Sequence, residues 1–98
     1  MSKAVNLAIQ ILPLGIPKAQ AYAIIDEAIS CVKKSGLSHV VCPFETVVEG
    51  SYEEVMILFN EMQKVCQQAG AEELLINLKL QRNFNKDIAI LDKTGKYL

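Results

Sequence analysis

The chain has 98 residues, a length that fits one domain, and 51% of them are hydrophobic, which is enough to build a core. A formal net charge of −1 gives no electrostatic basis for binding nucleic acid or an anionic membrane. No apolar run approaches the roughly 20 residues of a membrane span, and the first residues do not resemble a signal peptide. We therefore expect a cytoplasmic protein with neither nucleic acid nor a membrane as partner.

The first expected strand covers 5–11, where large aliphatic residues alternate with smaller or polar ones, namely Asn6, Ala8 and Gln10. A period of two is typical of a strand with one buried face. Pro17 suits the first turn of the helix that should follow, and Gly36 is suited to end it. Apolar residues recur at helical spacing between them: Ala21, Ile25, Ala28, Ile29 and Val32.

Two short strands are expected next, over roughly 37–42 and 45–49, with a turn at Pro43 and Phe44. The segment SYEE, starting at Ser51, has the form of a capping box, in which a Ser hydroxyl and a Glu carboxylate satisfy free backbone donors at a helix start. A strongly amphipathic helix should follow and end at Gly70.

The last expected strand covers 74–81, and the tail, residues 83–98, would either fray or dock on a neighbouring chain. The order strand, helix, strand, strand, helix, strand predicts an α+β, ferredoxin-like βαββαβ domain over 1–98, with its core at about 4–82. Right-handed crossovers place the first and third strands in the middle of a four-stranded antiparallel sheet, with both helices on one face.

The uncovered face of that sheet is neither plainly polar nor plainly apolar. It should carry the even residues of the first strand and the odd residues of the last, which include Leu75, Asn77, Lys79 and Gln81. Such a mixed face favours pairing with a second copy, as a homodimer or a homotetramer, although it is also compatible with a solvated sheet dotted with aliphatic residues.

Catalytic and metal chemistry find little support. The three cysteines are odd in number and do not have the spacing of a metal site. The one histidine, His39, does not belong to a motif that would pair it with a nucleophile. Glu45 and Glu49 are four residues apart on one strand, hence about 13 Å. This separation exceeds the roughly 6.5–9.5 Å of paired carboxylates in inverting glycosidases. We expect neither an enzyme nor a bound metal or cofactor.

Glu49 is the single most conspicuous residue, because it is a carboxylate at the end of an apolar strand, directly before a glycine. A partly desolvated carboxylate needs a positive or hydrogen-bonding partner. That partner could be a ligand, or Glu49 could simply reach water or the start of the following helix.

Three segments together resemble the small thiamine-binding protein family: AIQILPLG near the start, PFETVVEGSYEEV in the middle and INLKLQR near the end. Members of that family have a ferredoxin-like fold, form dimers and tetramers, and bind thiamine (vitamin B1) or its hydroxymethylpyrimidine part. The resemblance spans Val5 to Arg82. Gln81 departs from the family pattern, which often has an acidic residue between the basic residues that Lys79 and Arg82 match.

The resemblance implies a ligand site that contains Thr46 and Glu49 of the middle motif, with Gln10 nearby. A carboxylate can pair with an aminopyrimidine as it does with a guanidinium, and Phe44 or Tyr52 could offer an aromatic surface to a cationic ring. The expected ligand-binding residues are Gln10, Phe44, Thr46, Glu49, Tyr52 and Asn77. In a regular strand Thr46 and Glu49 point to opposite faces, so either a bulge re-aims one of them or two subunits share the site.

The sequence thus predicts non-catalytic binding of thiamine or its hydroxymethylpyrimidine part, in salvage, sensing or buffering. The alternative is an oligomeric interaction module that binds another protein through the open sheet face and has no small-molecule ligand.

Overall fold

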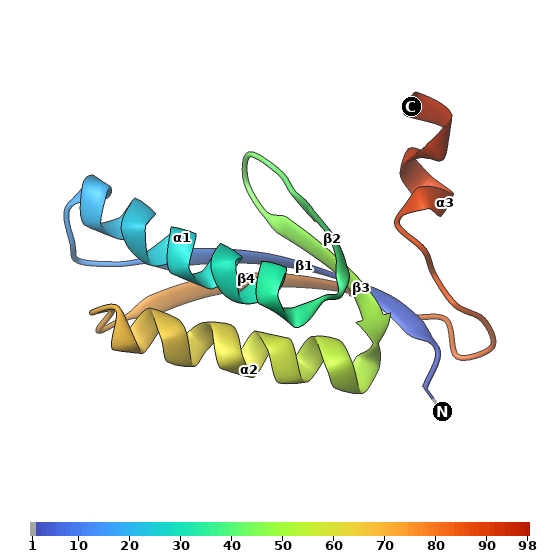
Figure 1. The fold of residues 1–98 in the computed structure, drawn as a ribbon, viewed down its shortest axis with the longest axis horizontal. Coiled ribbons are helices and arrows are strands. Elements are labelled where there is room, and N and C mark those ends of the chain that lie inside the picture. Colours follow the sequence, from blue (N-terminus) through green and yellow to red (C-terminus); the bar gives the residue numbers. More distant parts are fainter. Residues whose placement is uncertain (1) are drawn as a thin grey trace.

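The computed structural model describes residues 2–98 and has the predicted order of elements (Figure 1). Four strands form one antiparallel sheet in the order β2-β3-β1-β4, so that the first and third strands lie in the middle. Both long helices cover the same face, as predicted. The strands are β1 (Ala4–Pro13), β2 (Ser38–Val41), β3 (Thr46–Ser51) and β4 (Leu74–Gln81), and the long helices are α1 (Lys18–Ser35) and α2 (Tyr52–Gln68).

The helix ends follow the local sequence signals. Ser51 caps α2: its hydroxyl accepts a hydrogen bond from the Glu54 backbone at 3.1 Å, and the Glu54 carboxylate accepts one from the Ser51 backbone at 2.9 Å. The capping box is therefore complete. Helix α1 ends at Gly36, which has a φ of 77°, a left-handed conformation that glycine adopts without steric cost.

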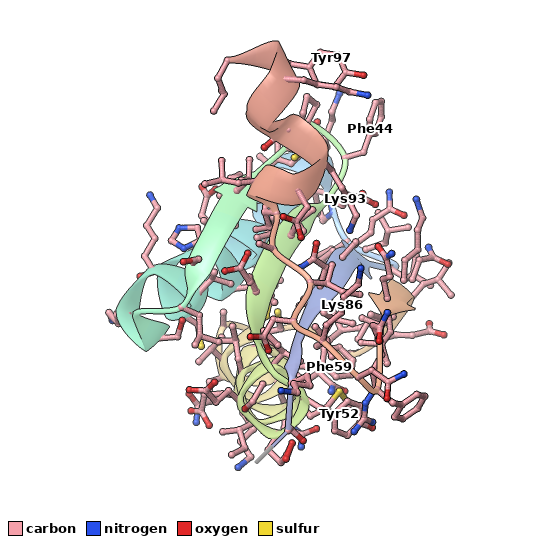
Figure 2. The ribbon with its side chains drawn as sticks, turned by 90° about the vertical axis from the view of Figure 1, so that its right-hand side faces the viewer. Phe44, Tyr52, Phe59, Lys86, Lys93 and Tyr97 are labelled. Carbon is pink, nitrogen blue, oxygen red and sulfur yellow. The ribbon has the colours of Figure 1, made fainter. Side chains whose placement is uncertain are left out.

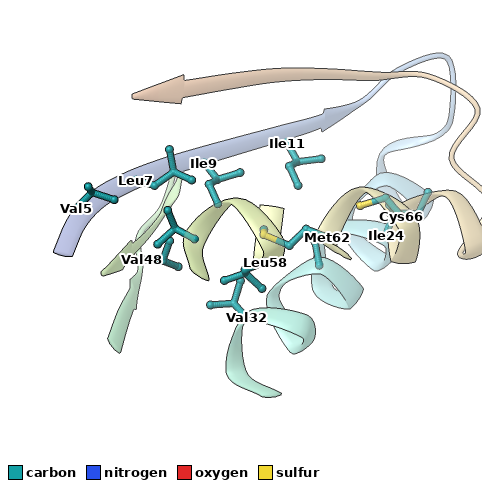
Figure 3. Packing of buried hydrophobic residues seen from close by; sticks show 12 residues of the cluster. Val5, Leu7, Ile9, Ile11, Ile24, Val32, Val48, Leu58, Met62 and Cys66 are labelled. Carbon is teal, nitrogen blue, oxygen red and sulfur yellow. The ribbon is translucent and has the colours of Figure 1, made fainter. Parts of the chain in front are cut away.

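One face of β1 supplies the centre of the core. Its odd-numbered residues project from the strand toward the helices (Figure 3). They meet residues of both helices at helical spacing, among them Ile24, Val32, Val55 and Leu58, all of which are buried. Burying this many aliphatic side chains is the main favourable term in folding a domain of this size. The β1 residues in this set are Val5, Leu7, Ile9 and Ile11.

The strand register fixes which residues share the open face. Directly opposed residues of antiparallel strands lie on the same face, so the pairing sorts the open face into rows across the sheet. One row is Ser38, Glu49, Asn6 and Gln81, the next is Val40, Val47, Ala8 and Lys79, and the third contains Gln10 and Asn77. The pairing of β1 with β3 runs without a break from Ala4 to Ile9, so no bulge re-aims Thr46 or Glu49.

The first part of the tail does not fray, as one of the two expectations had it, but docks on the sheet of its own chain. Figure 2 shows it passing across β1 and β3. Ile88 is buried, and its backbone N–H donates to the Ala4 carbonyl at 3.0 Å. We call residues 87–94 the strap; they end in the short helix α3 (Leu91–Thr94), which the 3-10 turn Gly95–Tyr97 follows. The sequence of this segment alone does not predict which residues it contacts, because its hydrogen-bond partners lie more than 40 residues away along the chain.

Candidate functional site

The candidate site lies where two central strands separate. The β1–β3 ladder ends at the pair Ile9 and Thr46, but β1 continues to Pro13, paired with β4 alone. From Gln10 onward one edge of β1 therefore has no neighbouring strand. The turn between β2 and β3 stands away from this edge, which leaves a gap between the turn and the end of β1.

That gap opens into a cavity of about 420 Å³, which we call the first cavity. Its apolar lining comes from β1, α1 and α2 and includes Ile9, Ile25 and Met62, and the rest of its lining includes polar and aromatic residues. A mostly apolar cavity with a few polar groups at defined places is the usual form of a small-molecule site. We call the polar and aromatic lining residues at the β2–β3 turn, the edge of β1 and α1 the mouth residues: Gln10, Tyr22, Phe44, Glu45 and Thr46.

Three of the six predicted ligand residues line the first cavity, and a fourth supports it. Gln10, Phe44 and Thr46 are in its lining. Asn77 lies beside Gln10 on the open face, and its side-chain amide donates to Gln10 Oε1 at 3.1 Å. This bond holds the Gln10 side chain on the open face, at the edge of the first cavity. Thr46 is only 6% exposed, whereas Phe44 is 82% exposed.

The other two predicted residues lie elsewhere. Glu49 is on the open face, and its Oε1 accepts a hydrogen bond of 2.6 Å from the Ile90 backbone N–H. The strap thus provides the hydrogen-bonding partner of Glu49 that the sequence could not identify. Tyr52 opens α2 and carries the Arg82 guanidinium over its ring at 4.5 Å. Figure 2 shows Phe44 in the upper part of the view and Tyr52 near the bottom, well apart, so they do not frame one site within a subunit.

Two of the mouth residues were not predicted from the sequence as ligand-binding residues. Glu45 was considered only as a partner of Glu49, yet it lies beside the first cavity, with Oε1 3.7 Å from Lys79 Nζ. Tyr22 projects from α1, more than half exposed, with the Lys18 ammonium 5.7 Å from its ring centre. The PFET turn was a usable signal for Glu45, since it places a carboxylate directly before Thr46.

A larger cavity of about 570 Å³, the helix groove, runs between α1 and α2 on the outside of the molecule. None of the predicted ligand residues lines it. Its carboxylates include Glu54, which is already engaged in the capping box, and Glu61, which raises the pKa of the Cys31 thiol in addition to the larger effect of burial. The first cavity is preferred as the candidate site because it is lined by predicted ligand residues, which the helix groove lacks.

Within residues 2–98, no three His, Cys, Asp or Glu side chains lie close enough together to hold a metal ion. None of the helices in that range is both long and apolar enough to cross a membrane. The cysteines in that range are free: Cys66 is buried, and Cys31 and Cys42 are partly buried.

Comparison with known proteins identifies the family. A structure of a domain of unknown function from Bacillus cereus has a TM-score of 0.91 and 30% identity, covering 100% of this chain and 93% of that one. A candidate thiamine biosynthesis/salvage protein from Thermotoga maritima has a TM-score of 0.88 and 27% identity, covering 97% and 99%. The UPF0045 protein CPE1503 of Clostridium perfringens is 28% identical over 93 residues, which are 94% of this chain and 95% of that protein.

A family model described as thiamine-binding protein matches residues 7–98, nearly the whole chain and including the strap. The resemblance seen in the sequence is thereby confirmed: the protein belongs to the thiamine-binding protein family.

Proposed function

We propose that the protein binds thiamine, or its hydroxymethylpyrimidine part, in the first cavity and performs no chemistry on it. Membership of the thiamine-binding family supports the ligand class. The observation that carries the proposal is the cavity itself, in which an apolar wall meets Gln10, Glu45 and Thr46 at one mouth. Its volume of about 420 Å³ is within the usual range for small-molecule sites, roughly 300–1,000 Å³.

The chemical groups of the ligand match those of the mouth. An aminopyrimidine presents a ring nitrogen beside an exocyclic amine, which the Thr46 hydroxyl and the backbone groups of β1 that lose their β3 partner from Gln10 onward can satisfy. A thiazolium ring carries a permanent positive charge, which the Glu45 carboxylate favours. Phe44 and Tyr22 offer aromatic faces to a flat or cationic ring. None of these roles needs a nucleophile or a proton carrier, so the proposed function is binding for salvage, sensing or buffering.

The test is isothermal titration with thiamine and with hydroxymethylpyrimidine. We expect Glu45→Gln to weaken thiamine binding about tenfold, equivalent to the loss of about 1.4 kcal/mol, because it removes the charge beside the thiazolium. Hydroxymethylpyrimidine lacks that ring, so its binding should change much less.

The matched control is Glu61→Gln, which removes the same charge from the helix groove. It should leave both affinities unchanged. A weaker affinity in this control together with an unchanged one in Glu45→Gln would move the site to the helix groove. Heat no larger than that of dilution for both ligands would contradict the proposed function.

A second candidate function is self-association or capture of another protein through the sheet. The observation that favours it is β4, an edge strand that exposes Leu75, Leu78 and Leu80 by 51%, 41% and 46%. Unpaired edge strands with apolar side chains readily pair with another chain. Sedimentation velocity tests it: a homodimer or homotetramer should revert to monomers when Leu78 and Leu80 are both replaced by Lys. A monomeric wild-type protein would contradict this candidate.

A further inference from the structure

A second cavity lies on the open face, between the sheet and the strap. It has a volume of about 320 Å³. Its floor is the row that contains Ala8, Val47 and Val40, and its cover is formed by Ile90, Lys93 and Thr94 of the strap. The sequence did not predict it, because the tail was expected either to fray or to dock on a neighbouring chain.

Two lysines line the second cavity, and one of them is held by a buried group. The Lys93 ammonium donates to Asn6 Oδ1 at 2.7 Å. Asn6 is only 5% exposed, and its side-chain N–H donates in turn to the Ile88 carbonyl at 2.9 Å, which fixes the orientation of the amide. Within residues 2–98, no carboxylate lies within 4.0 Å of the Lys93 ammonium. A positioned cation with only a neutral partner is suited to receive an anion.

The second lysine, Lys79, approaches the same cavity from β4. Its side chain is 80% exposed, and its ammonium lies 3.7 Å from Glu45 Oε1. A loose, exposed pair of this kind contributes little to stability, so the lysine can turn toward an incoming anion at small cost.

The two cavities share a wall. Cys42 and Glu45 line both, and these residues are joined by a backbone hydrogen bond of 2.8 Å at the base of the β2–β3 turn. Gln10 and Thr46 line the first cavity, Glu45 lines both, and Lys79 and Lys93 line the second. The sequence of environments is polar neutral, then negative, then positive.

We propose that the second cavity binds the phosphate group of a phosphorylated ligand whose rings occupy the first cavity, and that the protein therefore prefers thiamine phosphate esters to free thiamine. In these esters a neutral aminopyrimidine is followed by a cationic thiazolium and then by an anionic phosphate, which is the order of environments along the two cavities. This inference rests on the proposed function and adds the chemical class of the preferred ligand.

The test compares thiamine, thiamine monophosphate and thiamine diphosphate by isothermal titration with the wild type, Lys79→Gln, Lys93→Gln and the double variant. Wild-type protein should bind the monophosphate about tenfold more tightly than thiamine, equivalent to about 1.4 kcal/mol. The double variant should lose this preference and still bind thiamine within about twofold of the wild type. The preference should also shrink as salt is raised from about 0.01 to 1 M, because screening weakens the attraction between charges.

Lys86→Gln is the matched control, since Lys86 lies on the tail but lines neither cavity. It removes the same charge and should leave the preference intact. Because Lys93→Gln also alters a contact of the strap, Lys79→Gln provides the independent variant: it should lower the preference without changing the melting temperature.

The outcomes separate the two proposals. Tight binding of thiamine with equal or weaker binding of its phosphates overturns this inference and leaves the proposed function standing. A preference for phosphates that survives in the double variant, or that falls equally in Lys86→Gln, also overturns it. If neither thiamine nor its phosphates bind, the proposed function fails, and this inference fails with it.

Discussion

The contact between Glu49 and the strap leads to the sharpest prediction. Glu49 Oε1 accepts a hydrogen bond of 2.6 Å from the Ile90 backbone, and Glu49 is partly buried. Glu49→Ala removes this acceptor and leaves the amide without its partner. A hydrogen bond to a charged group contributes about 1.5–3 kcal/mol, and the lower end applies here because water reaches the carboxylate. We therefore expect a loss of about 1.5 kcal/mol in the free energy that holds the strap closed.

Native-state hydrogen exchange by NMR measures this loss directly. Since about 1.4 kcal/mol corresponds to a factor of ten, the Ile90 amide should exchange about tenfold faster in Glu49→Ala. The Ile88 amide should change less, because it is bonded to the Ala4 carbonyl rather than to Glu49. The matched control is Glu72→Ala, an exposed carboxylate in the loop before β4, which should leave both rates unchanged.

The same variant decides between the two roles considered for Glu49. If Glu49 anchors the strap, thiamine affinity should change little, since Glu49 does not line the first cavity. Unchanged exchange at Ile90, combined with a tenfold loss of thiamine affinity, would refute this reasoning. It would instead support the role that the family resemblance implies, in which Glu49 touches the ligand.

Two further predictions concern stability. Ser51→Ala should lower the free energy of unfolding by about 1 kcal/mol in urea denaturation, because it removes half of the capping box of α2, whereas Ser38→Ala on the exposed edge strand should have almost no effect. Burial raises the pKa of the Cys66 thiol above its ordinary value of 9.0. The folded protein therefore retains a proton that the unfolded chain releases, and stability should fall as the pH rises past about 9. That fall should be smaller in Cys66→Ala; an equal fall in both proteins would show that the thiol is not its source.

The fold could be predicted almost completely, because its signals are local and mutually consistent. Alternation in β1, the complete capping box at Ser51 and the glycine at position 36 each specify an element within a few residues. Once the order of elements is known, chain connectivity allows few sheet topologies. The strand bounds differed by one or two residues: β2 is confined to Ser38–Val41 and β3 extends to Ser51.

The candidate site could be predicted only in part. Gln10, Phe44 and Thr46 lie around the first cavity because they flank one turn and one strand end that face each other. Glu45 was missed because the spacing within one strand gives only its distance from Glu49. That Glu45 and Gln10 line the same cavity depends on how two separate strands are placed, which the sequence does not show. Glu49 was singled out correctly as a carboxylate that needs a partner, but the sequence could not name the partner, which lies 41 residues away at Ile90.

The sequence alone determined the order of elements, the buried face of β1 and the family, since periodicity, caps and motifs are properties of neighbouring residues. Only the tertiary structure decided where the strands separate, where the strap docks and which side chains share a cavity. These depend on contacts between residues far apart in the chain, such as Lys93 with Asn6. The physical reason is that a local sequence pattern determines the direction in which a side chain leaves its own helix or strand. A binding site also depends on which residues from other parts of the chain lie in that direction, and only the tertiary structure determines those.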